Sequence, residues 1–350
     1  MTALTNPAPR RTLLAHLFAS LRGALPVVVV VAALLGLWLA AVAPMNFRLA
    51  LDAAMRGGED VTPATPDEQG ETGLVRLMID NPGVIPAAYA FERPRLPRPQ
   101  DVVVEMYENT IGLARGCEFT GWGAGREHWT GLSEGCLRVV NNRRSLLFHA
   151  WQTLAPTLLG FAIGTGLGIL LAVGIVHNRT MDLSVMPWAI ASQTIPILAI
   201  APMVIVVLNA VGVQGLLPKS LISSYLSFFP VVVGMVKGLR SPRGMELDLM
   251  RTYSASGAQV FWKLRLPASL PYLFASLKIG IAAALVGTIV AELPTGARFG
   301  LGARLLSGSY YGQTVQIWAA LLMAALCAAV LVWLIGAVER RVLDRMGLAR

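Results

Sequence analysis

The residues of this 350-residue chain that could do chemistry are few, and their spacing does not form a catalytic site. The sequence contains no His-Glu-x-x-His and no Gly-x-x-x-x-Gly-Lys-Ser pattern, which argues against a zinc protease and a nucleotide-binding loop. Residues 131–135 (GLSEG) match Gly-x-Ser-x-Gly, but they lie in a glycine-rich polar stretch and not between a predicted strand and a helix, as the hydrolase motif requires. Residues 217–220 (LPKS) end like a phosphate-binding loop but lack the glycine before the lysine. We therefore predict no catalytic residue, no enzyme activity and no cofactor bound by this chain.

Cysteine and histidine provide one candidate disulfide and no candidate metal site. Cys117 and Cys136 bracket a segment rich in glycine and tryptophan, and their pairing would close a loop in an oxidising compartment. Two unpaired thiols are the alternative. Cys327 lies inside an apolar run, where cysteine behaves as a small apolar residue. Two cysteines alone cannot form a zinc site, and no ligand-like spacing is found among the histidines His16, His128, His149 and His177.

The overall composition indicates a membrane protein. The chain is 55% hydrophobic and only 14% charged, whereas soluble domains carry about a quarter charged residues. The net charge is +9, but residues 44–149 hold an excess of acidic residues. The basic residues lie mainly beside the ends of apolar runs, as the positive-inside rule requires. This distribution argues against nucleic-acid binding.

Six apolar runs approach or exceed the roughly 20 helical residues that cross a hydrocarbon core. They are residues 24–43, 151–176, 183–208, 217–236, 273–291 and 314–338. Arginines before the first run and in segment 240–271 predict that both chain termini are cytoplasmic. A cleaved signal peptide is the alternative for the first run, but the run is long and no clear cleavage site follows it.

These runs predict an all-α polytopic membrane protein with a polar periplasmic insert between helices 1 and 2. Three features are expected in that insert: a flexible acidic linker at 62–73, an extended proline-rich strap at 93–99 and an amphipathic helix at 101–115. The predicted regions are a cytoplasmic N-terminus (1–23), helix 1 (24–43), the insert (44–149), the membrane core (150–338) with a cytoplasmic loop (240–271), and a cytoplasmic C-terminus (339–350).

Polar and helix-breaking residues within the apolar runs are candidates for a solute pathway. Gln193 and Thr194 precede Pro196, which breaks a helix and frees backbone carbonyls. Glu292, at the outer end of the fifth run, is the exception in runs that otherwise lack the carboxylates and arginines of ion-coupled carriers. Packing is the alternative role of each residue, and Glu292 could simply face water.

Segment 240–271 is charged and interrupted by proline and glycine, so it must lie at a membrane face rather than in lipid. We predict two short helices, 248–254 and 258–264, joined by a small-residue elbow at 254–257. Leu266-Pro267 would end the second helix, and Val260, Phe261 and Trp262 would anchor a partner protein. An interfacial helix lying on lipid head groups is the alternative.

The spacing in this segment resembles the EAA loop of binding-protein-dependent ABC importer permeases. That pattern is Glu-Ala-Ala, three residues, Gly, nine residues, a branched apolar residue, any residue and Leu-Pro. Residues 248–250 (DLM) fill the triplet, Ser254 replaces the glycine, and residues 264–267 (LRLP) supply the end. Residues 193–196 (QTIP), 278–280 (KIG) and 300–302 (GLG) look like the nitrate/sulfonate/taurine branch. The resemblance covers roughly residues 145–345 and leaves the insert unexplained.

This resemblance implies a MetI-like arrangement of about six transmembrane helices in the inner membrane of a bacterium. It implies a permease for a small solute such as nitrate, a sulfonate or taurine. The implied partners are a cytoplasmic ATPase that uses ATP and Mg²⁺, a periplasmic substrate-binding protein, a second permease copy in a homodimer, and membrane lipid. The residues expected at the ATPase contact are Asp248, Arg251, Ser254, Ala255, Ser256, Gly257, Leu264, Leu266 and Pro267.

Two other functions stay open at this point. A membrane-anchored sensor or scaffold would use the insert as a ligand-binding domain, and it would need no ATPase partner. An ion-coupled secondary carrier would transport without ATP. The glycines Gly160, Gly164 and Gly168 leave a similar choice open, because their four-residue spacing allows close helix packing either within one subunit or across a dimer.

Overall fold

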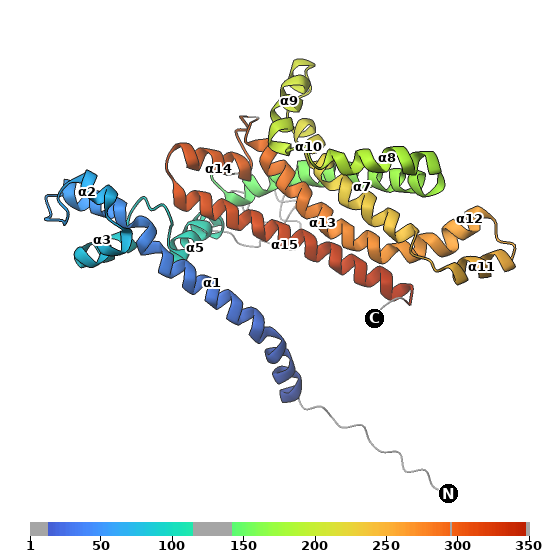
Figure 1. Ribbon diagram of the computed structural model, residues 1–350, viewed down its shortest axis with the longest axis horizontal. Coiled ribbons are helices and arrows are strands. Elements are labelled where there is room, and N and C mark those ends of the chain that lie inside the picture. Colours follow the sequence, from blue (N-terminus) through green and yellow to red (C-terminus); the bar gives the residue numbers. More distant parts are fainter. Residues whose placement is uncertain (1–12, 115–141, 295, 348–350) are drawn as a thin grey trace, which may run out of the picture. The chain divides into compact units, whose positions relative to one another are not determined.

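The computed structural model describes residues 13–114, 142–294 and 296–347 (Figure 1). Every regular secondary-structure element in these ranges is a helix, in agreement with the predicted all-α class. Contacts divide the chain into two compact units, residues 1–103 and 104–350. The candidate disulfide partners Cys117 and Cys136 lie outside the described residues.

The first unit is built on one long helix, α1 (Leu13–Arg56). Its apolar stretch is exposed over most of its length, with Leu37 71% exposed, as expected for side chains that face lipid. The predicted helix 24–43 is thus part of a longer helix that continues to Arg56. The extension is stable because Phe47, Ala50 and Leu51 repeat at helical spacing and are buried.

Four short helical elements follow α1, and the last three cover its buried face. They are α2 (Pro66–Glu71), α3 (Leu74–Asp80), the 3₁₀ turn η1 (Pro82–Val84) and α4 (Ile85–Tyr89). The buried core of the unit consists of Phe47, Ala50, Leu51, Leu77, Val84 and Ala88. Burial of each large side chain in such a core stabilises the fold by about 1.5–3 kcal/mol relative to exposure. This small apolar core therefore holds the short helices against α1.

Two buried asparagines hold the irregular segments of the first unit. Asn81 accepts a hydrogen bond from the Thr62 backbone amide (2.8 Å) and donates to the Thr62 carbonyl (2.6 Å). The segment 62–73, predicted as a flexible linker, therefore starts with an anchored turn and then forms α2. Asn46 accepts from the amides of Arg95 and Leu96 and donates to the Leu96 carbonyl. The proline-rich strap forms no helix or strand before Pro99, and whether it is extended stays a prediction.

The predicted amphipathic helix of the insert is shorter than expected. Helix α5 (Pro99–Glu108) ends well before residue 115 and is followed by the 3₁₀ turn η2 (Ile111–Ala114). Its side chains Val104 and Tyr107, and Ile111 of the turn, are exposed. These three residues belong to the second unit, and their helical spacing does not mark a face that is buried within it.

The second unit is a helical bundle in which α10 (Leu216–Leu239) packs between α7 (Leu146–His177) and α13 (Leu266–Glu292) (Figure 1). Small residues allow this close approach. A Cβ atom added at Gly164 would lie 2.7 Å from the Ser224 carbonyl oxygen of α10. Gly160 and Gly168 face α10 in the same way. The spaced glycines thus serve packing within one subunit.

The remaining helices of this unit surround that centre. Helix α14 (Leu301–Tyr310) leads to α15 (Thr314–Arg345), and both pack on α13. An ion pair joins Lys278 of α13 to Glu339 of α15. This lysine thus has a carboxylate partner within the bundle.

Five helices in the described residues are long and apolar enough to cross a membrane. The sixth predicted run, residues 183–208, is instead a bent pair, α8 (Arg179–Ser192) and α9 (Ile197–Ala210), whose axes differ by 97°. The total is six if this pair counts as one span. The chain is therefore a multi-pass membrane protein, with a broken helix in place of one predicted continuous span.

Candidate functional site

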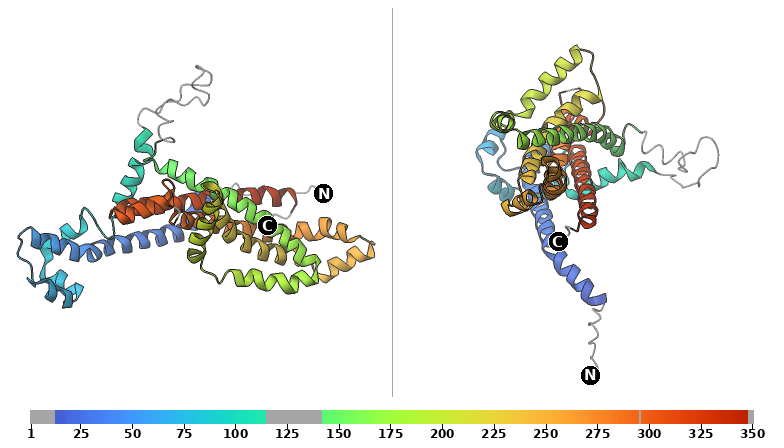
Figure 2. Two further views of the ribbon diagram at one scale, coloured as in Figure 1. Left: turned by 90° about the horizontal axis from the view of Figure 1, so that it is seen from above. Right: turned by 90° about the vertical axis from the view of Figure 1, so that its right-hand side faces the viewer.

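The segment between α10 and α13 forms a helical hairpin at one end of the bundle. Helix α11 (Gly244–Thr252) and helix α12 (Gly257–Val260) project beyond the neighbouring helices (Figures 1 and 2). Neither helix contains a buried residue. Met245, Leu249 and Tyr253 are all more than half exposed. The hairpin thus presents apolar side chains that this subunit leaves uncovered.

The turn of the hairpin depends on an unusual backbone conformation at Ser254. Its φ angle is +52°, the only positive value at a non-glycine residue in the described part of the chain. The Ser254 amide donates to the Arg251 carbonyl (2.8 Å), and the Ala255 amide donates to the Met250 carbonyl (3.0 Å). These two bonds define a Schellman motif, whose left-handed position favours glycine. Ser254 therefore occupies the position where the EAA pattern has glycine, and for the same physical reason.

The second helix of the hairpin begins with a capping box. The Ser256 hydroxyl accepts from the Gln259 amide (3.3 Å), and the Gln259 side chain accepts from the Ser256 amide (2.9 Å). This places Ala255 and Ser256 in the turn and Gly257 at the first helical position. The small residues of the predicted elbow thus end one helix and start the next.

The hairpin continues into α13 without a break, which corrects the prediction that Leu266-Pro267 ends the second helix. A π-helical turn, Phe261–Arg265, joins α12 to α13, and residues 257–292 form one helical segment. The wider turn accommodates Pro267, which cannot donate a hydrogen bond. Leu264, Leu266 and Pro267 thus lie where the hairpin joins the bundle.

The base of the hairpin is fixed to the bundle by side chains from other helices. Arg240, which caps α10, pairs with Asp182 of α8 at 2.9 Å. The His177 ring at the end of α7 contacts the Phe261 ring edge-on, with centroids 5.3 Å apart. Phe261 therefore packs against the core of its own subunit, contrary to its predicted role as a partner anchor, whereas Trp262 is exposed.

The predicted coupling residues lie along the hairpin and at its junction with α13. Asp248 and Arg251 form an ion pair at 2.9 Å, but both side chains are largely exposed. Such pairs contribute about 0–1 kcal/mol. Their charges are therefore available to a partner at little cost to the hairpin.

Three of the four candidate pathway residues lie at the bend between α8 and α9. Gln193 caps α8, Pro196 caps α9, and Thr194 donates to the Ala191 carbonyl. The Ser192 carbonyl, freed by the break, accepts a hydrogen bond from the Tyr225 hydroxyl of α10. The predicted break at Pro196 is confirmed, and it is fixed to the central helix. The role of these residues in a pathway stays a prediction.

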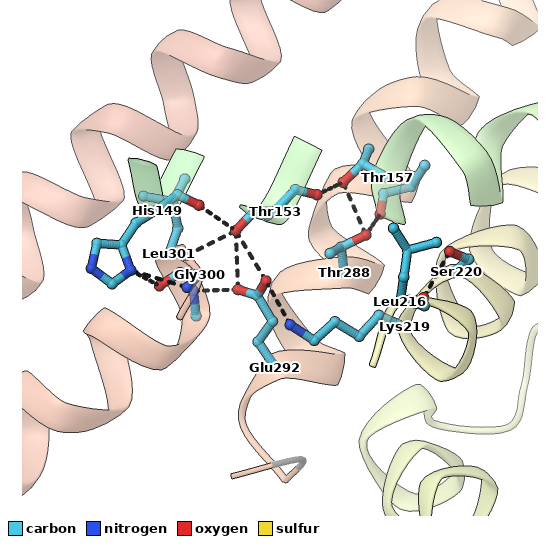
Figure 3. A network of polar contacts seen from close by, with 12 residues as sticks. His149, Thr153, Thr157, Leu216, Lys219, Ser220, Thr288, Glu292, Gly300 and Leu301 are labelled. Atoms are coloured by element: carbon cyan, nitrogen blue, oxygen red, sulfur yellow. Dashed lines mark hydrogen bonds and ion pairs between the residues drawn. The ribbon is translucent and has the colours of Figure 1, made fainter. Parts of the chain in front are cut away.

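Glu292 lies in a separate buried network (Figure 3). The network is near the start of α10 and the end of α13, away from the hairpin. Its carboxylate is 3.1 Å from the Thr153 hydroxyl and 3.4 Å from the Lys219 ammonium group, and it accepts from the Gly302 amide at 2.8 Å. The side chain is fully buried, so Glu292 does not face water. A buried charge with several partners of this kind is a constraint on helix packing.

The Gly-Leu-Gly sequence at 300–302 is explained by this network. The Gly300 amide donates to His149 Nδ1 (3.0 Å), and the Leu301 amide donates to the Thr153 hydroxyl (2.8 Å). Gly300 has φ +132°, and a Cβ atom at Gly300 would collide with the Glu292 carboxylate. Sequence reasoning identified Glu292 and the two glycines but missed His149 and Thr153, whose only signal was a polar residue just before or inside the second apolar run.

Comparison with known proteins identifies the class to which this fold and hairpin belong. Residues 164–345 match the family described as "Binding-protein-dependent transport system inner membrane component". The chain belongs to this family of ABC importer permeases, as the hairpin spacing predicted.

Three named relatives are similar to part of this chain. The formylaminopyrimidine transport permease protein ThiX of Halalkalibacterium halodurans is 34% identical over 167 residues, which cover 47% of this chain and 65% of the relative. The riboflavin transport system permease protein RibX of Chloroflexus aurantiacus is 32% identical over 62% of this chain and 75% of its own length. A Bacillus subtilis protein named for aliphatic sulfonate transport is 25% identical over 57% and 70% respectively.

Proposed function

We propose that this chain forms part of the translocation pathway of an ATP-driven importer, and that a separate ATPase subunit binds the α11–α12 hairpin. The observation that carries the proposal is the hairpin itself. It has the spacing of the family's coupling loop, a left-handed residue at the glycine position, and no buried residue in either short helix. An exposed amphipathic helix seated in a groove is a common mode of protein recognition.

The surface of the hairpin supports a protein partner. Met245, Leu249 and Tyr253 are exposed on the hairpin and would be buried in a groove on the ATPase. Burial of such side chains contributes about 25 cal/mol for each Å² of apolar surface. The exposed charges of Asp248 and Arg251 would then set the orientation of the partner rather than most of its affinity.

The connections of the hairpin support its role in coupling. The hairpin is continuous with α13 through the π-helical turn, and Arg240 links its start to α8. Displacement of the hairpin by a closing ATPase would therefore move α13 and bias the bundle between two conformations. The far end of α13 carries Glu292, so that movement would reach the opposite membrane face.

The remaining parts of the proposal follow from family membership. The pathway would be completed by a second copy of this chain, and a periplasmic binding protein would deliver the solute at the face opposite the hairpin. The relatives are named for different solutes, a pyrimidine, riboflavin and sulfonates, so we propose only a small solute for this chain. Both chain termini and the hairpin would lie in the cytoplasm.

Co-purification with the tagged ATPase subunit tests the proposal. Leu249→Asp and Tyr253→Asp should each abolish co-purification, because each buries a charge in the apolar contact. Met346→Asp is the matched control, since Met346 is exposed at the end of α15 outside the hairpin. Retained ATPase binding in both hairpin variants, or uptake into vesicles without ATP, would refute the proposal. The second outcome would indicate an ion-coupled carrier.

A further inference from the structure

We infer that a cavity beside the Glu292 network binds a small oxyanion, such as the carboxylate or sulfonate group of a solute. The cavity has a volume of about 340 Å³ and lies within the second unit. This size is at the lower end of the range for small-molecule sites, about 300–1,000 Å³. That the bound anion is a transported solute rests on the proposed function, whereas binding itself does not.

The cavity is built from four parts of the chain that meet at the end of the bundle opposite the hairpin. Gln152 comes from α7 and Asn209 from α9. Lys219 comes from the first turns of α10, and Arg298 and Phe299 follow α13. The lining thus combines two cations with side-chain amides, which can donate hydrogen bonds to oxygen atoms.

The charge of the lining favours an anion. Among the described residues no carboxylate lines the cavity, and Glu292 lies behind Lys219, to which it is paired at 3.4 Å. Arg298 is exposed and makes no hydrogen bond or ion pair with another residue in the described part of the chain. Its guanidinium group therefore has all its donors available. Arginine binds carboxylate and similar oxyanions through two parallel hydrogen bonds.

The surroundings of the cavity add to the positive potential. The Arg143 guanidinium group lies over the Phe299 ring, 5.3 Å from its centroid. A cavity lined by one sign of charge attracts ligands of the opposite sign, so a cationic or neutral solute would gain less from this lining.

Glu292 gives the inference a distinctive consequence. Its carboxylate offsets part of the Lys219 charge, although it does not line the cavity itself. Removal of that negative charge in Glu292→Gln keeps the shape of the side chain and should tighten anion binding, by about fivefold for one charge acting over several ångströms. A residue with only a structural role would not produce tighter binding.

Calorimetric titration of the purified full-length protein in detergent tests the inference. The probes are sodium methanesulfonate and sodium acetate at low ionic strength. Arg298→Gln should weaken binding of at least one probe by about tenfold or more, because a charge-assisted hydrogen bond is lost. Arg179→Gln is the matched control, since Arg179 is an exposed arginine at the start of α8, outside the cavity, and should leave the affinity unchanged.

The outcomes separate this inference from the proposed function. Equal affinity in Arg298→Gln and wild type, or no binding of either anion to the wild type, would overturn the inference while ATPase co-purification stayed intact. Failure of the wild-type chain to co-purify with the ATPase subunit would refute the proposed function but not the anion site. If Glu292→Gln fails to fold, the Arg298→Gln result still decides, because that side chain is exposed.

Discussion

Replacement of Ser254 by glycine should stabilise the α11–α12 hairpin. Ser254 has φ +52°, where a side chain costs roughly 1–2 kcal/mol because Cβ crowds the backbone. Glycine removes this cost but loses more conformational entropy on folding, which destabilises the hairpin by about 0.5–1 kcal/mol. The expected net gain is therefore about 0.5–1 kcal/mol, or roughly a two- to fivefold change in the local opening equilibrium.

Hydrogen–deuterium exchange of the hairpin amides measures this change directly. The Ala255 amide is bonded to the Met250 carbonyl, so its exchange reports opening of the turn. We expect exchange of this amide to slow by roughly two- to fivefold in Ser254→Gly. A stability change of the whole protein is not required, since the hairpin contains no buried residue in either of its short helices.

The same substitution two residues later provides the control. Ser256 has φ −65° and caps α12, so Ser256→Gly gains nothing from backbone freedom and loses the cap. It should speed exchange slightly, since glycine is a few tenths of a kcal/mol worse than serine at an N-cap. Faster exchange in Ser254→Gly, in the same direction as Ser256→Gly, would refute the assignment of a strained left-handed turn.

Three further substitutions test the packing of the two units. Gly164→Ala should destabilise the bundle by about 1–3 kcal/mol, because the new Cβ would meet the α10 backbone; thermal unfolding in detergent measures this, and Gly166→Ala, with open space at its Cβ position, should have little effect. Thr153→Val should lower the free energy of unfolding by about 1–3 kcal/mol, because it removes the hydroxyl that bonds Glu292 and the Leu301 amide. In the same assay Thr165→Val should be neutral or stabilising, because its buried hydroxyl has no partner in the described residues; an equal loss in both variants would argue against the network. Asn46→Ala should expose the 95–96 amides to faster deuterium exchange, and unchanged protection there would contradict the anchoring of the strap.

The features that local sequence determines were predictable. Apolar runs located the membrane helices, because their length and composition must match the hydrocarbon core. Pro196 located the bend between α8 and α9, and small residues located the hairpin elbow. The glycines of α7 indicated a close helix contact, but not that α10 is the partner. The family was also predicted from the spacing of the hairpin residues, and the family match confirms it.

The features that depend on distant contacts were not predictable. The acidic segment 62–73 has a composition typical of a flexible linker, yet Asn81 fixes its start through the Thr62 backbone. Phe261 was predicted to be a partner anchor, because no local pattern shows that the His177 ring lies against it. The Glu292 network joins residues more than 130 positions apart, so no local pattern could reveal it.

The side of the membrane on which the hairpin lies tests the central claim most directly. In a chain whose native cysteines are replaced by serine, a single cysteine at Tyr253 reports this through a membrane-impermeant maleimide, because that position is 76% exposed. We predict labelling in inverted vesicles, protection when the ATPase subunit is added, and no labelling in intact cells. Labelling of this cysteine from outside intact cells would contradict the account.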